Sequence, residues 1–136
     1  MTGFAGLNYP SSRLQSDVLG DVALQQAIDA ALAETAHLPS YTVQWKPHFQ
    51  GISDMSFLGQ AAVNSDVVSS NTPVSRLIDI PPHNALRFPV VNIGPWGREF
   101  HQRLERVHAP YAFDVLPKII MSIVENFFAA STDSKK

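Results

Sequence analysis

Apolar residues recur at helical spacing near the start of the chain. Within residues 21–37, DVALQQAIDAALAETAH, the apolar positions that share one helix face are Leu24, Ile28, Ala31 and Leu32. This spacing predicts an amphipathic helix, with Asp21 as a plausible N-cap and Pro39 closing the unit. Residues 1–20 carry Gly, Pro, Ser and Asn without a period, so we expect a linker or lead-in there.

A second helical pattern lies near the C-terminus and is broader. Residues 113–131, FDVLPKIIMSIVENFFAAS, predict a helix that Asp114 can cap and that tolerates Pro117 in its first turn. Its apolar face comprises Val115, Leu116, Ile119, Ile120, Ile123, Val124, Phe127 and Phe128. Burying such a face would contribute roughly 1.5–3 kcal/mol per large side chain before entropy is subtracted. Residues 131–136 predict a disordered, solvated tail.

Two segments between these helices have strand-like patterns. Residues 41–45, YTVQW, alternate apolar and polar side chains, and residues 88–93, FPVVNI, are almost continuously apolar. Short helices are predicted between them, around residues 53–62 and 72–80. The order helix, strand, helical crossover, strand, helix predicts an α/β fold, a β-α-β unit with parallel strands and flanking helices. Because two strands make a thin sheet, we expect the chain to be part of a larger sheet or to complete its sheet with a partner.

Candidate chemistry lies where the two predicted strands end. Ligands of open α/β sheets bind beyond the carboxyl ends of the strands. The loops that leave those ends are PHFQGISD, residues 47–54, and GPWGREFH, residues 94–101. Parallel strands bring both loops to one edge, so we expect Asp54 and His101 to converge there.

His101 is a candidate metal ligand, because neutral imidazole is a common donor to zinc. Glu105 could accept the other ring N–H of His101 and so orient it. His101, Glu105 and His108 also have i, i+4, i+7 spacing, but Pro110 argues against a long helix that would align them. The alternative for His101 is a surface histidine in a charged segment, and the alternative for Asp54 is a helix cap.

The charged residues around His101 allow two interpretations. Arg98, Arg103 and Arg106 could hold a substrate carboxylate in bidentate fashion. The neighbouring glutamates offset their charge, however, which favours a solvated face. Trp96 can line a pocket or pack on its own loop.

Composition narrows the function classes. The 136 residues are 45% hydrophobic, enough for one domain with a core. The net charge of −2 argues against a nucleic-acid-binding surface, and the absence of cysteine excludes disulfides and thiolate metal sites. No signal peptide and no apolar run of about 20 residues is visible, so we expect a soluble, cytoplasmic protein without membrane or nucleic-acid partners.

Two stretches, GISDMSFLG and PVVNIGPWGREFHQRLERVHAPYAFDVLP, resemble a known family. They are similar to the C-terminal part of the aminoacylase/carboxypeptidase-type zinc peptidases, the ArgE/DapE relatives (metallopeptidase family 20), and most similar to their arginine-utilisation (RocB-type) branch. The family pairs a Gly-x-[Ser/Thr]-Asp motif with a strand, a Gly-Pro loop, a histidine, a glutamate and a final helix. The matching positions here are Gly51, Ser53, Asp54, Gly94, Pro95, His101 and Glu105.

The resemblance implies a role for each matched residue. His101 takes the position of the family's last zinc ligand, with Glu105 beside it. Ser53, Asp54 and Gly94 take positions at the substrate-binding edge. The family holds two zinc ions and hydrolyses amide bonds of peptides or N-acylated amino acids, with a metal-bound water as nucleophile and a carboxylate as general base. Residues 21–130 would then be the C-terminal portion of a zinc-exopeptidase-like catalytic domain.

The sequence departs from the family in its other ligands. The family's His-x-Asp motif, bridging Asp, Glu-Glu pair and lid histidine have no counterpart in the chain. We therefore expect no catalytic residue in the chain and no activity alone, with a missing catalytic segment or a second copy as partner. Two alternatives are a non-catalytic binding or assembly module, and an independent metal site made by His101, Glu105, His108 and His83.

Overall fold

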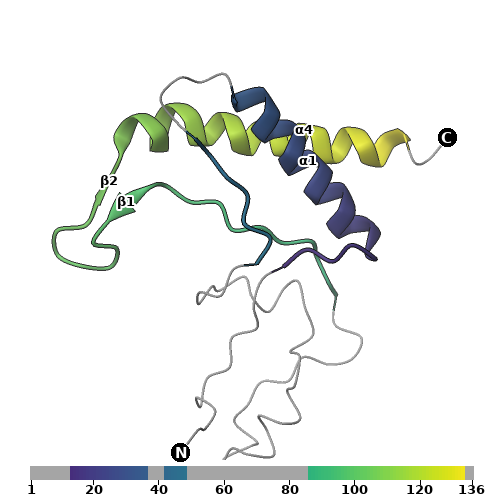
Figure 1. Cartoon of the computed structure of the whole chain (residues 1–136), viewed down its shortest axis with the longest axis horizontal. Coiled ribbons are helices and arrows are strands. Elements are labelled where there is room, and N and C mark those ends of the chain that lie inside the picture. The colour runs from purple at the N-terminus through teal and green to yellow at the C-terminus, as the bar shows by residue number, and fades with distance from the viewer. Residues whose placement is uncertain (1–12, 37–41, 49–85, 134–136) are drawn as a thin grey trace, which may run out of the picture. The chain divides into compact units, whose positions relative to one another are not determined.

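The computed structural model describes residues 13–36, 42–48 and 86–133 (Figure 1). The elements in chain order are α1 (Leu19–Thr35), β1 (Gly97–Arg98), β2 (Arg106–Val107), the π-helical turn η2 (Tyr111–Val115) and α4 (Leu116–Asp133). The chain divides into two compact units, residues 1–13 with 47–92 and residues 14–46 with 93–136. All the named elements belong to the second unit.

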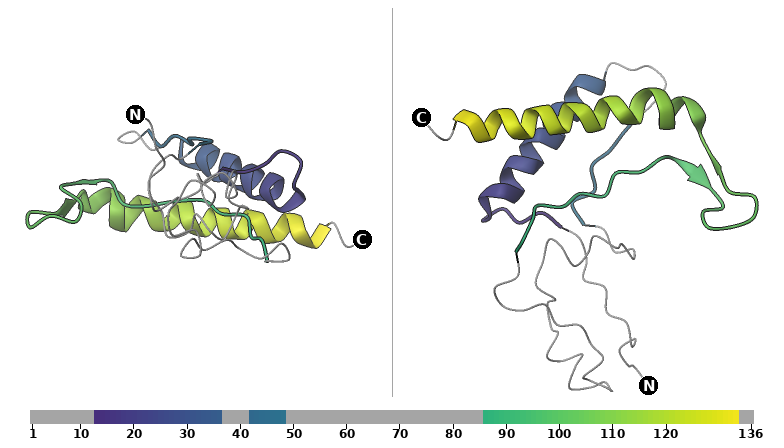
Figure 2. Two further views of the ribbon diagram at one scale, coloured as in Figure 1. Left: turned by 90° about the horizontal axis from the view of Figure 1, so that it is seen from below. Right: turned by 180° about the vertical axis from the view of Figure 1, so that it is seen from behind.

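The core of this unit lies between α1 and α4, which pack across one another (Figures 1 and 2). Its buried apolar residues are Leu24, Ala27, Ile28 and Ala31 of α1, Val115 of η2, and Leu116, Ile119 and Ile123 of α4. The predicted face of the first helix is confirmed at Leu24, Ile28 and Ala31, whereas Leu32 is only half-buried. Two alanines one turn apart present little side-chain bulk, which allows a close approach of the two helices.

A polar contact also joins the two helices. The hydroxyl of Ser122 donates to the Glu34 carboxylate over 2.6 Å, linking α4 to α1 near the end of the shorter helix. The Asn126 amide donates in turn to the carbonyl and hydroxyl oxygens of Ser122. This chain of hydrogen bonds fixes which turn of α4 lies against the last turn of α1.

Only one side of the broad apolar face predicted for the final helix is buried. The exposed apolar side chains of this segment are Phe113, Ile120, Met121, Val124 and Phe128. Most of them recur at intervals of three or four residues, so they form a continuous stripe beside the buried one. Within the part of the chain that the structure describes, no helix combines the length and the apolarity needed to cross a bilayer.

The prediction that Asp21 caps the first helix is wrong. The helix begins at Leu19, and Asp21 is its third residue, 2% exposed. Its carboxylate accepts the backbone N–H of Gln15 over 2.9 Å. Asp21 thus fastens the preceding turn to the helix start, where a carboxylate also complements the positive end of the helix dipole.

The prediction that Asp114 caps the final helix is also wrong. The first helical bond joins the N–H of Ala112 to the carbonyl of His108, and the Tyr111 N–H donates to Nδ1 of His108 over 3.3 Å. Residues 111–115 then form a π turn, closed by the N–H of Leu116 on the carbonyl of Tyr111. Because Pro117 has no N–H to donate, the regular α ladder is interrupted here in any case.

The described sheet is a small antiparallel hairpin, with Gly97 opposite Val107 and Arg98 opposite Arg106. Neither predicted strand carries a strand assignment in its described residues, 42–45 and 88–93. The alternation predicted for residues 41–45 is nevertheless present in the side chains, since Val43 and Trp45 are half-buried between exposed neighbours. The predicted helical crossover lies outside the described residues, so the parallel β-α-β unit stays a prediction.

Candidate functional site

The hairpin that carries His101 is held at its base and within its loop. Beyond the β1–β2 pairing, the His108 N–H donates to the Trp96 carbonyl over 2.8 Å. Inside the loop, the N–H of Gln102 donates to the Glu99 carbonyl and that of Glu105 to the Gln102 carbonyl, over 3.0 and 3.1 Å. The loop is therefore made of successive tight turns with their own backbone hydrogen bonds.

Gly97 permits the close approach of the two strands. A Cβ atom at this position would collide with the carbonyl oxygen of Arg106 and would lie 3.1 and 3.2 Å from two ring carbons of Phe100. By contrast, an added Cβ at Gly94 meets nothing within 4 Å. The first glycine is required by packing within the hairpin, whereas the second, predicted at the substrate-binding edge, has open space around it.

An ion pair crosses the hairpin beside the loop. Nε and Nη2 of Arg106 donate to the two carboxylate oxygens of Glu99 over 2.9 and 3.0 Å. The two side chains are 64% and 38% exposed, so the pair is screened by water and worth about 0.2–1 kcal/mol. Its main effect is geometric, because the two-point contact ties the start of the loop to β2.

His101 lies in the loop with its side chain exposed. Its φ is 60° and that of Glu99 is 56°, so two non-glycine residues occupy the left-handed region. Such residues cost roughly 1–3 kcal/mol each and persist only where the surrounding structure holds them. The loop hydrogen bonds and the Glu99–Arg106 pair provide that support.

Glu105 contacts His101, but through the backbone. Its Oε2 accepts the His101 N–H over 3.2 Å, so this bond leaves the imidazole uninvolved. The expectation that Glu105 orients the ring of a zinc-bound His101 remains a prediction, and the observed bond instead closes the loop. The carboxylate helps to set the direction in which the histidine leaves the hairpin.

His108 has a structural task that the sequence did not reveal. Its Nδ1 accepts the Tyr111 N–H over 3.3 Å. The ring also lies against Trp96, with centroids 5.0 Å apart and planes inclined by 40°. His108 thus joins the hairpin to the start of the last helical segment.

The described residues do not by themselves fit a zinc centre. His101 lies in the hairpin loop, Glu105 precedes β2 and His108 follows it, so the three do not share a helix face. Across residues 13–36, 42–48 and 86–133, no group of three His, Cys, Asp or Glu side chains is placed to hold a metal ion. Ser53 and Asp54 lie outside the described residues, as does His83, and so does the expected convergence of Asp54 with His101.

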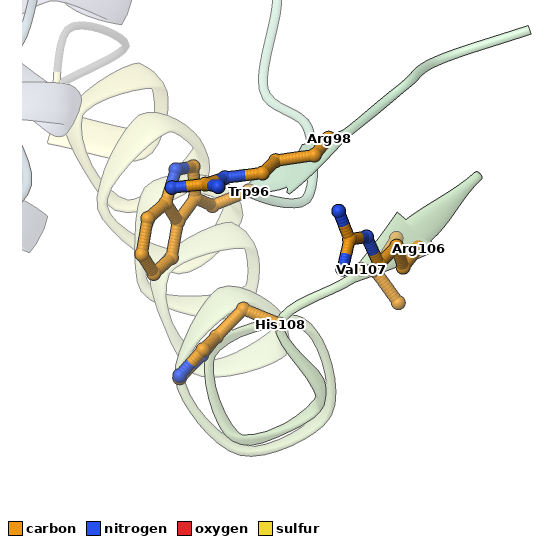
Figure 3. Close-up of a pocket in the computed structure, with 5 residues that line it drawn as sticks. All are labelled: Trp96, Arg98, Arg106, Val107 and His108. Carbon is orange, nitrogen blue, oxygen red and sulfur yellow. The ribbon is translucent and has the colours of Figure 1, made fainter. Parts of the chain in front are cut away.

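A surface hollow of about 280 Å³ lies on the hairpin (Figure 3). It is lined by Trp96, Arg98, Arg106, Val107 and His108. Trp96 is 58% exposed and Val107 40% exposed, so the apolar part of the lining is open to solvent. The hollow therefore combines two guanidinium groups with an indole wall, and His101 is not among its lining residues.

Comparison with known proteins gives two relatives, both from Bacillus subtilis (strain 168). RocB is 33% identical over 116 residues, which are 82% of this chain and 20% of RocB. The uncharacterized protein YqjN is 38% identical over 76 residues, which are 54% of this chain and 14% of YqjN. The chain is a partial homologue of RocB. It spans about a fifth of the length of that relative.

The similarity to RocB confirms the RocB-type part of the predicted resemblance, at the level of a partial homologue. No family model matches the chain, and no solved structure matches it.

Proposed function

We propose that this chain provides one ligand, His101, to the metal centre of a RocB-like, zinc-dependent amidohydrolase that is inactive without further segments. The observation that carries the proposal is the 33% identity to RocB over 82% of the chain. The proposed substrates are peptides or N-acylated amino acids, with arginine catabolism as the setting and the cytoplasm as the compartment. When bound, zinc would supply an activated water for amide hydrolysis.

The geometry around His101 is compatible with this role. A histidine that binds a metal ion whose other ligands come from other segments must be accessible to solvent. The His101 side chain is exposed. Its direction must also be fixed, and the left-handed backbone with the Glu105 hydrogen bond restricts it. Strained backbone at an exposed polar residue is typical of functional positions, because stability alone would favour glycine there.

For residues 41–93 we propose the fold that the sequence predicts, a parallel β-α-β unit. This unit would bring Ser53 and Asp54 to the edge of the sheet near Gly94. The other metal donors and the general base would come from a RocB-like segment or a second copy of the chain. His101 would then need only to complete a centre whose donors lie mainly elsewhere.

The test exchanges the matching fifth of RocB for this chain. RocB and the exchanged protein are purified, and their zinc content and their hydrolysis of N-acetyl amino acids are measured. We expect zinc in both proteins, and we expect His101→Ala in the exchanged protein to lose at least one zinc equivalent together with hydrolysis. The matched control is His48→Ala, another exposed histidine, which should change neither.

Three outcomes would refute the proposal: zinc-free RocB, unchanged zinc content in the His101→Ala variant, or full hydrolytic activity of this chain alone. Circular dichroism of the exchanged protein checks folding. If it does not fold, substitution in RocB itself at the position aligned with His101 gives the same decision.

A second candidate, a non-catalytic assembly module, is favoured by the exposed apolar stripe on α4. The same exchange distinguishes the two. Assembly without zinc and without dependence on His101 supports the module, whereas zinc bound through His101 supports the hydrolase.

A further inference from the structure

Two arginines lie directly opposite each other on the hairpin, but only one of them is paired with a carboxylate. Arg98 and Arg106 are register partners in the antiparallel pair. Like charges at directly opposite positions destabilise such a pair. The Glu99 carboxylate neutralises Arg106 through two hydrogen bonds. Among the described residues, no carboxylate pairs with Arg98.

The hollow therefore has one uncompensated positive charge. Arg98 and Arg106 contribute two positive charges to the lining, and Glu99, which pairs with Arg106, contributes one negative charge. The guanidinium of Arg98 still has its parallel N–H groups available, and this planar fork matches a carboxylate. A single positive charge suits a monoanion better than a phosphate dianion.

The rest of the lining indicates what the ligand carries besides its charge. In Figure 3 the Arg98 side chain extends toward the Trp96 side of the hollow, and the Arg106 guanidinium lies on the other side. The indole face and Val107 offer apolar surface exposed to solvent. A volume of about 280 Å³ lies just below the usual range of small-molecule pockets, so the hollow matches the size of a small ligand.

We propose that the hollow formed by Trp96, Arg98, Arg106, Val107 and His108 binds the carboxylate of a small monoanionic ligand whose apolar part packs on Trp96. The carboxylate pairs with Arg98 and compensates the positive charge that Glu99 leaves unbalanced. The site needs no metal, and His101 is not among its lining residues. The proposed carboxylate binding can therefore be tested independently of the proposed hydrolysis.

The test is an NMR titration of the full chain with 3-phenylpropionate. The matched control ligand is 3-phenylpropanamide, which has the same shape without the charge. The Trp96 indole N–H signal, assigned through Trp96→Phe, reports binding. We expect millimolar binding of the acid that is at least tenfold tighter than that of the amide and weakens as salt is added.

Substitutions distinguish the effect of the Arg98 guanidinium from the effect of the overall positive charge of the loop. Arg98→Gln should weaken binding of the acid at least tenfold, and Arg98→Lys should have an intermediate effect because an ammonium does not offer the planar fork. Arg103→Gln removes a charge from the same loop outside the hollow and should leave binding unchanged. Equal binding of acid and amide, equal binding of inorganic phosphate, or an equal loss in Arg103→Gln would each overturn the proposal.

Discussion

The close approach at Gly97 gives the sharpest prediction about the hairpin. In Gly97→Ala, the new methyl group would overlap the Arg106 carbonyl oxygen and touch the Phe100 ring. The ring is 46% exposed and can move aside. The carbonyl belongs to the opposite strand, and it cannot move without disturbing the pairing of Gly97 with Val107.

The cost can be estimated from the type of contact. Overpacking that forces a backbone shift costs typically 1–3 kcal/mol, and about 2 kcal/mol is a reasonable central value here. Since every 1.4 kcal/mol is a factor of ten, the hairpin would open roughly thirtyfold more often. No glycine among the described residues has a positive φ, so the penalty comes from steric overlap and not from the backbone dihedral.

Amide hydrogen exchange of the His108 N–H measures this opening directly, because that group donates to the Trp96 carbonyl across the hairpin. The matched control is Gly94→Ala, where the added methyl group meets nothing within 4 Å. Loss of glycine flexibility in the unfolded chain should make the control neutral or stabilising by about 0.4–1 kcal/mol. Exchange rates that change equally in the two variants would refute the packing argument.

Two further predictions concern the helix starts. Asp21→Ala removes the acceptor of the Gln15 N–H and should lower the free energy of unfolding, measured in urea, by about 1–3 kcal/mol. The control is Asp17→Ala, at an exposed position, which should change the free energy of unfolding by less than about 0.5 kcal/mol. Equal effects of the two substitutions would contradict the role of Asp21. Burial raises the pKa of Tyr111 above its ordinary value, so this group favours the folded state below about pH 10 and loses that contribution as pH rises through the raised pKa. In an alkaline absorbance titration, Tyr111→Phe should remove a step above the ordinary tyrosine range, and an unchanged titration curve would contradict the burial of this phenol.

The sequence predicted the presence of both helices correctly, but it did not predict the residues that cap them. Apolar periodicity located both helices because α1 and α4 bury their stripes against each other, and burial is what the periodicity records. The caps were misassigned because an aspartate near a helix start has several possible partners. Asp21 bonds the backbone of Gln15 from within the helix, and the capping of the last helical segment falls to a histidine, a residue type with no strong capping preference.

The hairpin was missed for a different reason. Its strands are two residues long, and the loop between them is rich in charged residues, so no alternation is visible. The left-handed backbone at Glu99 and His101 gives no signal in the sequence, since glycine is the residue expected there. Gly97, and the opposite charges of Glu99 and Arg106, were the available hints. His101 was singled out by its place in a motif, which does not depend on recognising the hairpin.

The π turn at residues 111–115 affects the direction in which the hairpin leaves the last helix. A π turn accommodates one residue more than the α-helix around it, so deleting a single residue there would give the segment α-helical winding, apart from the hydrogen bond that Pro117 cannot donate. Such a deletion would also turn everything before it by about 100° around the helix axis. The direction in which the hairpin leaves the helix at His108 therefore depends on this one-residue excess, and a deletion in the π turn would direct the loop of His101 toward different neighbours.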